Sequence, residues 1–193
     1  MTPIYVIRHG ETAWSRDQRH TGRTDVPLTS RGEQQARDLA ARLRPFSFTH
    51  VFTSPQRRAR DTCALAGYSA VARVDADLRE WDCGDYEGLT LEQIHAVRPG
   101  WLLYRDGCPG GESPAGIRVR ADALLARLRA LDGSVALFSH SHFLCALAAR
   151  WIGLDASDGG RLRLDTAAFG ILDVEHDRAD EPSLAGWNIM PTP

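Results

Sequence analysis

Short apolar runs alternate with helical patterns along almost the whole chain, and this alternation restricts the fold more than any other feature. Strands are predicted at 3–8, 49–54, 70–76, 134–140, 167–176 and, at an edge, 185–190. Helices are predicted within 30–43, 54–67, 89–97, 117–131 and 141–154. The pattern favours an α/β fold, a three-layer α/β/α sandwich around a mainly parallel mixed sheet. The 193 residues suit a single domain, 1–193.

Two helix starts carry capping signals. Ser30 and Glu33 have the spacing of a capping box. Ser54 followed by Pro55 fits an N-cap and a first helical position. We therefore expect one helix to start at Ser30 and another at Ser54.

Charge and composition exclude several kinds of function. All 23 Lys and Arg residues are arginine, which removes Schiff-base catalysis and the P-loop lysine. A formal net charge of −2 gives no strong attraction to nucleic acid or a membrane surface, and no apolar run is long enough to cross a bilayer. The four cysteines are scattered without a CxxC pair, and no signal peptide precedes them, so we expect free thiols in a cytoplasmic protein.

Basic side chains follow three of the predicted strands. The first strand ends in Arg8 and His9, the second leads into Arg57 and Arg58, and the strand at 134–140 ends in His140. Ligands of open α/β sheets bind beyond the carboxyl ends of the strands, where helix N-termini add N–H donors. These residues predict an anion cup, the place where the three strand ends meet, and a phosphate suits it because arginine binds oxygens bidentately.

Four blocks in the chain, in this order and spacing, resemble the histidine phosphatase superfamily, the phosphoglycerate mutase-like proteins: RHGET at 8–12, TSPQRRARDT at 53–62, LREWDCGDYEG at 78–88 and SHSHF at 139–143. The resemblance implies that His9 attacks phosphorus and becomes phosphohistidine. It implies that Arg8, Arg58 and His140 hold the phosphoryl oxygens. Glu80 would donate a proton to the leaving oxygen and then activate water.

The same resemblance implies further phosphate contacts and a narrower subgroup. Ser15, Thr21 and Gly22 match phosphate-loop positions, and Ser141 replaces a common glycine but keeps its backbone N–H. TAWS, HTGRTDVPLT and RDGCPGGES look like the subgroup of fungal sedoheptulose-1,7-bisphosphatase and related bacterial acid phosphatases. Cys83 and Cys145 depart from that subgroup, which expects tyrosine and arginine there, and a contact of either with substrate would alter the sugar preference.

The function expected is a metal-independent phosphomonoesterase, without cofactor, that acts on a small phosphorylated metabolite such as a sugar bisphosphate. The alternatives are a phosphoglycerate-type mutase and a non-catalytic module that binds a phosphorylated ligand. The HSH motif at 140–142 could indicate a zinc site, but no acidic motif accompanies it and no metal is expected. His142 is therefore interpreted as a packing or rim residue. Glu112 is a candidate for the pocket wall. The oligomeric state stays open, with a homodimer through the C-terminal strands as one alternative.

Overall fold

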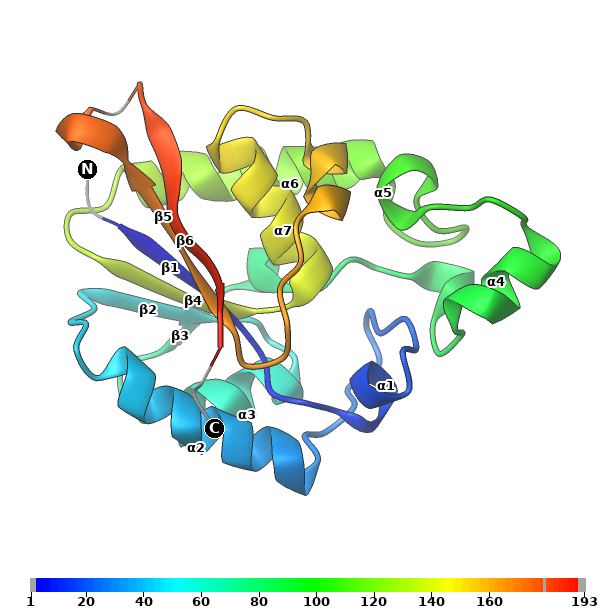
Figure 1. Cartoon of the computed structure of the whole chain (residues 1–193), viewed down its shortest axis with the longest axis horizontal. Helices are drawn as coiled ribbons and strands as arrows, with labels where there is room; N and C mark the ends of the chain where they lie inside the picture. Colours follow the sequence, from blue (N-terminus) through cyan, green and yellow to red (C-terminus); the bar gives the residue numbers. More distant parts are fainter. Residues whose placement is uncertain (1–2, 179, 191–193) are drawn as a thin grey trace.

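The computed structural model describes residues 3–178 and 180–190, so residues 1–2, 179 and 191–193 of the predicted single domain lie outside the described residues. One six-stranded sheet runs through the molecule in the order β3-β2-β4-β1-β5-β6 (Figure 1). β1 to β4 are mutually parallel, whereas β5 and β6 run antiparallel to their neighbours. The predicted α/β class with a mainly parallel mixed sheet is confirmed. The strands are β1 (Ile4–Arg8), β2 (His50–Thr53), β3 (Arg73–Val74), β4 (Val135–Ser139), β5 (Phe169–Val174) and β6 (Pro182–Ile189).

Helices cover both faces of the sheet. The α-helices are α1 (Ala13–Arg16), α2 (Ser30–Leu43), α3 (Arg57–Leu65), α4 (Leu91–Val97), α5 (Leu103–Asp106), α6 (Pro114–Arg129) and α7 (Ser141–Trp151). Short 3-10 turns are η1 (Ala76–Leu78), η2 (Gly84–Tyr86), η3 (Ala156–Arg161) and η4 (Glu175–Asp177). α2 and α3 lie on one face and α6 and α7 on the other, while α4 and α5 project beyond the sheet, across from α1 (Figure 1).

β1 illustrates why the sheet is buried on both faces. Ile4 and Val6 pack into the core under α6 and α7, whereas Tyr5 and Ile7 pack into the core on the side of α2 and α3. Successive side chains of a strand point to opposite faces, so a continuous apolar run fills both layers at once.

Both predicted caps are wrong in position, for a local reason in each case. The N-cap of α2 is Thr29, whose extended backbone lets its hydroxyl accept the Gly32 N–H, and Ser30 is already helical. α3 begins only at Arg57, because the Ser54 hydroxyl donates to the Gln56 side chain instead of capping a helix. In both cases the hydrogen bond that decides where the helix begins joins residues two or three positions apart.

β6 forms an edge of the sheet, as predicted for 185–190. Its pairing with a second copy of the chain stays a prediction. None of the helices in the described part of the chain combines the length and the apolar run that a bilayer crossing requires.

Candidate active site

Three adjacent parallel strands end side by side at one edge of the sheet. The register pairs Arg8 of β1 with Ser139 of β4, and Thr53 of β2 with Phe138 of β4. The residues that follow, His9 after β1 and His140 after β4, therefore meet, with ring centroids 5.2 Å apart.

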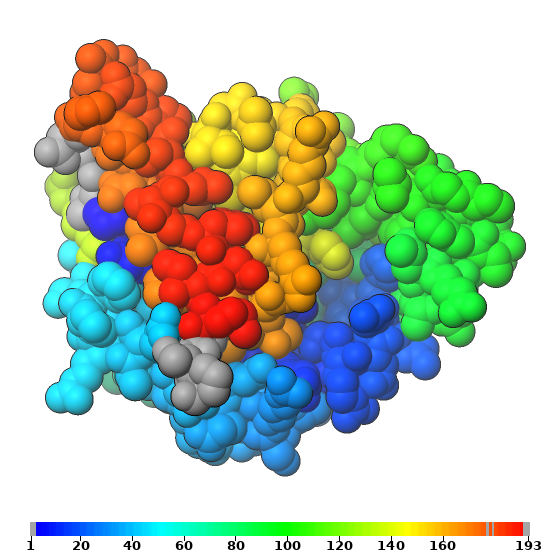
Figure 2. All heavy atoms as spheres, in the orientation of Figure 1, coloured from blue at the N-terminus to red at the C-terminus, as the bar shows by residue number. Residues whose placement is uncertain are grey.

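A cavity of about 190 Å³ opens beside His9. Figure 2 shows that face of the molecule, hollowed where the N-terminal segment (blue), the α4–α5 region (green) and the segment around η3 (orange) approach one another. The cavity is lined by Arg8, His9, Ser15, Gln18, Arg19, His20, Thr21, Glu80, Ser141 and His142.

The His9 ring is held in one tautomer. It is 5% exposed, and its Nδ1 lies 2.7 Å from the carbonyl oxygen of Gly10. A carbonyl can only accept, so Nδ1 carries the proton and Nε2 keeps its lone pair. Burial, then the charges of Arg58 and Arg8, holds the pKa of His9 well below its usual value. His9 is therefore a neutral imidazole at pH 7, the form that can act as a nucleophile.

Position 10, directly after His9, requires glycine for a steric reason. A Cβ at Gly10 would lie 2.3 Å from the carbonyl oxygen of Gly32 in the first turn of α2. Only glycine lets α2 approach this closely and leaves the Gly10 carbonyl beside the imidazole.

Arg8 faces the cavity with donors to spare. Its Nη1 donates to the Leu164 carbonyl at 2.7 Å, while its buried Nε has no hydrogen-bond partner in the described part of the chain. A buried unpaired donor costs free energy unless a ligand satisfies it. Of the residues predicted for the anion cup, Arg8 and His9 have the geometry of a ligand contact.

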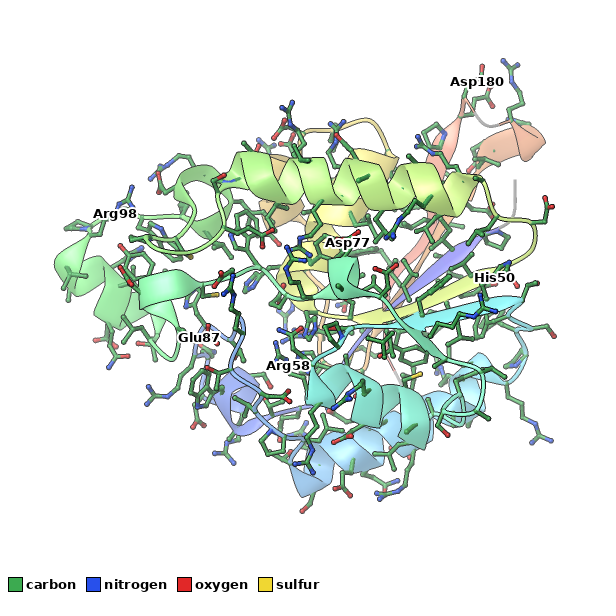
Figure 3. The ribbon with its side chains drawn as sticks, turned by 180° about the vertical axis from the view of Figure 1, so that it is seen from behind. His50, Arg58, Asp77, Glu87, Arg98 and Asp180 are labelled. Atoms are coloured by element: carbon green, nitrogen blue, oxygen red, sulfur yellow. The ribbon has the colours of Figure 1, made fainter. Side chains whose placement is uncertain are left out.

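Arg58 (labelled in Figure 3) and His140 are fully buried, and the His140 ring lies next to that of His9. Arg58 Nε donates to His140 Nδ1 at 3.1 Å, and His140 Nε2 then donates to the Ser54 hydroxyl at 2.8 Å. The other Arg58 donors bind the carbonyls of Thr24 and Gly22 at 2.9 and 3.0 Å. Burial, then the Arg58 charge, keeps the pKa of His140 well below its usual value. Both predicted phosphate ligands already have protein partners, and neither lines the cavity in the described residues.

The helix N-termini predicted to receive the anion are also occupied. At α3, the Arg57 N–H donates to the Asp25 carboxylate at 2.6 Å. At α7, the N–H groups of His142 and Phe143 donate to Glu80 at 3.2 and 2.9 Å. Carboxylates from distant segments thus cap both helices, as the partial positive charge at a helix start favours.

Of the four lesser phosphate contacts, Ser15, Thr21 and Ser141 line the cavity and Gly22 does not. The Ser15 hydroxyl donates within its own capping box, to the Thr12 carbonyl, and the Ser141 hydroxyl donates to the Leu164 carbonyl. The Gly22 N–H donates to Glu87.

Glu80 is 5% exposed and accepts three backbone N–H groups, from Trp81 at 2.8 Å besides the two of α7. Its Oε2 also lies 3.5 Å from Nδ1 of His142. Burial alone raises the pKa of Glu80, but the imidazoles of His142 and His140 and the Trp81 N–H outweigh it and place the pKa well below its usual value. The group is a carboxylate at pH 7.

Several residues that shape the site are not predicted by any pattern in the sequence. His20 lines the cavity, and its only sequence signal is its place directly before the predicted Thr21–Gly22 loop. The Glu87 carboxylate accepts the N–H groups of three consecutive residues of that loop, 22–24, at 2.7–3.1 Å (Figure 3). Arg120, 6% exposed on α6, binds the carbonyls that lead into Glu80, and a helical pattern does not predict such a buried arginine.

Other candidates lie away from the cavity. Glu112 pairs with Arg120 at 2.8 Å and does not line the cavity, so that expectation is wrong. Cys83 and Cys145 are buried free thiols that do not line it either. Within residues 3–178 and 180–190, no group of three or more His, Cys, Asp or Glu side chains has the arrangement of a metal site.

Comparison with known proteins shows that the chain is similar to phosphatases in sequence and fold. Residues 4–189 match the histidine phosphatase superfamily (branch 1). An acid phosphatase of Mycobacterium tuberculosis is 44% identical over 178 residues, 90% of this chain and 87% of the relative. The sedoheptulose 1,7-bisphosphatase of Saccharomyces cerevisiae is 31% identical over 258 residues, 99% of this chain and 95% of the relative. A solved mycobacterial glucosyl-3-phosphoglycerate phosphatase in complex with VO3 superposes with a TM-score of 0.86 at 31% identity, over 98% of this chain and 100% of that one.

Proposed function

This chain belongs to the histidine phosphatase superfamily and is a phosphatase, and on that premise we propose that it hydrolyses small phosphomonoesters through a phosphohistidine at His9, without a metal. The observation that carries the proposal is the His9 tautomer. The Nδ1–H donates to Gly10 at 2.7 Å, so Nε2 presents a lone pair next to Arg8 at the cavity. Nothing has to remove a proton from His9 before it attacks.

The charge that the reaction needs comes from arginine. Phosphoryl transfer depends mainly on positioning and on stabilising negative charge on the equatorial oxygens. Arg8 brings its positive charge to the cavity wall, and the buried Arg58 adds a second, fixed positive charge. For Arg58 and His140 to bind the oxygens directly, as the resemblance implies, they would have to exchange their present partners for phosphate.

The leaving oxygen needs a proton when its bond to phosphorus breaks. Glu80 lines the cavity and is the group proposed to move this proton, and its Oε2 lies 3.5 Å from Nδ1 of His142. The first half-reaction leaves the alcohol and phospho-His9, and water then attacks phosphorus to release inorganic phosphate.

For the substrate, we propose a small sugar phosphate and, more narrowly, a sugar bisphosphate. The cavity of about 190 Å³ is smaller than a typical drug-sized pocket of roughly 300–1,000 Å³, which suits a small metabolite. Arg19, His20 and Gln18 line it as polar groups available to hydroxyls or a second anionic group. The names of the yeast and mycobacterial relatives point the same way.

The mutase alternative lacks support within the chain. Mutases of the family carry longer insertions that enclose the substrate, and this chain is short and has no lysine to hold a substrate carboxylate. We further propose a cytoplasmic location, consistent with four free thiols, and no nucleic-acid or membrane partner.

The test is phosphate release across a panel of sugar mono- and bisphosphates, with 3-phosphoglycerate included, in the absence of any bisphosphate primer. The proposal expects release from at least one sugar phosphate. Isomerisation of 3-phosphoglycerate without net release, seen once a bisphosphate primer is added, would establish the mutase, and the absence of any turnover with or without the primer would leave the binding module.

A further inference from the structure

The more exposed wall of the cavity carries an arginine that the proposed reaction does not use. Arg19 follows α1 and lines the cavity together with Arg8. It is half-buried, whereas His9 and Glu80 are only 5% exposed. A substrate that places its phosphoryl group against His9 therefore extends from there toward the more exposed wall, where Arg19 lies.

The turn that carries Arg19 is held in place from two sides. α1 ends in a Schellman motif, in which the Arg19 N–H donates to the Trp14 carbonyl at 2.8 Å and the Gln18 N–H donates to the Ser15 carbonyl at 3.4 Å. Arg19 then pairs with Thr90, the N-cap of α4, in an antiparallel bridge, which joins two segments that Figure 1 shows facing each other. The backbone of Arg19 thus has a fixed position at the cavity wall.

Gln18 occupies the position of this motif where glycine is usual. Its φ of 55° lies in the left-handed region, which is unfavourable for a residue with a Cβ. A glycine would adopt this conformation without strain but would bring no side chain to the cavity, which Gln18 lines beside Arg19. Backbone strain of this kind gathers at functional sites, so we interpret the Gln18 amide as part of a polar site.

The Arg19 side chain is anchored through one of its nitrogens. Nη1 donates to the Gly88 carbonyl at 2.7 Å. Gly88 has a φ of 79° and packs against the Trp14 ring, where a Cβ would lie 3.2 Å from a ring carbon. A guanidinium carries several N–H donors and this bond uses one of them, so the anchor orients Arg19 and leaves donors for a ligand.

The charge of the cavity wall is not balanced within the protein. Among the arginine and acidic side chains that line it, Arg8 and Arg19 are positive and Glu80 is negative, and Glu80 already accepts three backbone N–H groups. Arg19 forms no ion pair with a carboxylate in the described residues, since the neighbouring Asp17 pairs with Arg16 at 2.9 Å. The excess positive charge attracts an anionic group of a ligand.

We propose that Arg19, with Gln18 beside it, binds a second phosphate group of the substrate, so that the enzyme prefers a sugar bisphosphate to the corresponding monophosphates. This rests on the proposed function, in which the first phosphate is transferred to His9. A guanidinium binds phosphate oxygens through two parallel N–H groups, and such bonds are stronger than those between neutral groups. Arg19 selects the substrate and takes no part in the transfer itself.

The experiment uses fructose 1,6-bisphosphate and sedoheptulose 1,7-bisphosphate, each beside its two monophosphates, and measures kcat/KM for phosphate release. In the wild type, we expect at least one bisphosphate to exceed its monophosphates by about 10- to 100-fold, the size of hydrogen bonds to a charged group. Arg19→Gln should remove most of this preference by lowering kcat/KM for the bisphosphate, with a far smaller change for the monophosphates. Arg19→Lys keeps the charge but loses the fork, so it should retain part of the preference.

Arg16→Gln is the matched control, because Arg16 belongs to the adjacent helix, is 58% exposed and does not line the cavity. It should keep the wild-type preference. Added salt should reduce the preference in the wild type but hardly in Arg19→Gln, because a contact between half-exposed charges is screened.

Three results would overturn the assignment: a wild type without preference for either bisphosphate, a full preference in Arg19→Gln, or equal losses with bisphosphate and monophosphates in that variant, which would make Arg19 merely structural. The proposed function fails separately, if the wild type releases phosphate from none of these esters and from p-nitrophenyl phosphate neither.

Discussion

The carboxylate of Glu80 accepts the backbone N–H of Phe143 at 2.9 Å, across 63 positions of the chain, and thereby caps α7. The segment after η1 and the helix after β4 are held together by this bond. Oε2 of the same carboxylate lies 3.5 Å from Nδ1 of His142, so one carboxylate caps a helix and contacts a side chain of the cavity.

Glu80→Gln should destabilise the protein in a pH-dependent way. The pKa of Glu80 in the folded state lies well below its usual 4.5, so its contribution is present above that pH and is lost as the pH falls toward the folded-state value. We expect the wild type to exceed the variant by about 1.5–3 kcal/mol at pH 7, the usual range for hydrogen bonds to a charged group, and by less at pH 3.5. Urea unfolding at both pH values measures the difference, and a difference independent of pH would contradict the assignment of a stabilised carboxylate.

Arg120→Met should cost far more than the same change on the exposed side of α6. Arg120 pairs with Glu112 at 2.8 Å and binds the carbonyls of Asp77 and Arg79, so its loss leaves a partly buried carboxylate and free carbonyls. We expect about 3–5 kcal/mol, as for other broken buried pairs. Arg127→Met is the control: that side chain is 53% exposed and bridges Asp75 and Asp77, so its expected cost is at most about 1 kcal/mol. Equal costs in urea unfolding would show that the buried pair contributes no more than the exposed one.

Arg8→Met should mainly weaken anion binding, whereas Arg58→Met should mainly lower the stability of the fold. Arg8 lines the cavity and donates one hydrogen bond, to the Leu164 carbonyl, so its loss should weaken vanadate binding while the fold keeps most of its stability. Arg58 is fully buried and binds two loop carbonyls and His140, so its loss should lower the free energy of unfolding by several kcal/mol, on the order of 1.5–3 for each lost charged hydrogen bond. Titration with vanadate and urea unfolding of both variants separate the two effects. A stable Arg58→Met protein that loses vanadate affinity as strongly as Arg8→Met would instead assign Arg58 directly to the anion.

The phosphatase activity should survive chelation and be inhibited by phosphate analogues. Arg8 and the buried Arg58 supply the positive charge that a divalent metal supplies elsewhere. We expect an unchanged rate in EDTA, and competitive inhibition by inorganic phosphate and, more strongly, by vanadate. Loss of the rate on chelation, with recovery on addition of Mg²⁺ or Zn²⁺, would contradict a metal-independent reaction.

The sequence predicts the central strands β1 and β4 well because their signals are local, whereas of the strand predicted over 70–76 only Arg73–Val74 forms. The run Ile4–Ile7 is apolar at every position and is buried on both faces, and SVALFS gives an equally clear β4. Their register then brings His9 and His140 together without further information. The site residues that directly follow a strand, such as His9 and His140, can therefore be predicted from the sequence.

What the sequence does not predict depends on partners far along the chain. Ser54 looks like a helix cap, but its hydroxyl lies between Gln56 and His140. The helix N-termini look free for an anion, but Asp25 and Glu80 occupy them. The pairings with His140, Asp25 and Glu80 are not encoded in a local pattern, because they form only when the sheet has brought distant segments side by side.

A rapid-quench trap of the covalent intermediate tests whether His9 is the nucleophile. Wild-type protein mixed with a ³²P-labelled substrate should hold acid-labile, base-stable phosphate, and peptide mapping should place it on His9. His9→Ala should hold none and lose turnover by at least ~10³-fold, as expected when a covalent nucleophile is removed. Label on another residue, or appreciable turnover by His9→Ala, would contradict the central claim that the neutral Nε2 of His9 is the nucleophile.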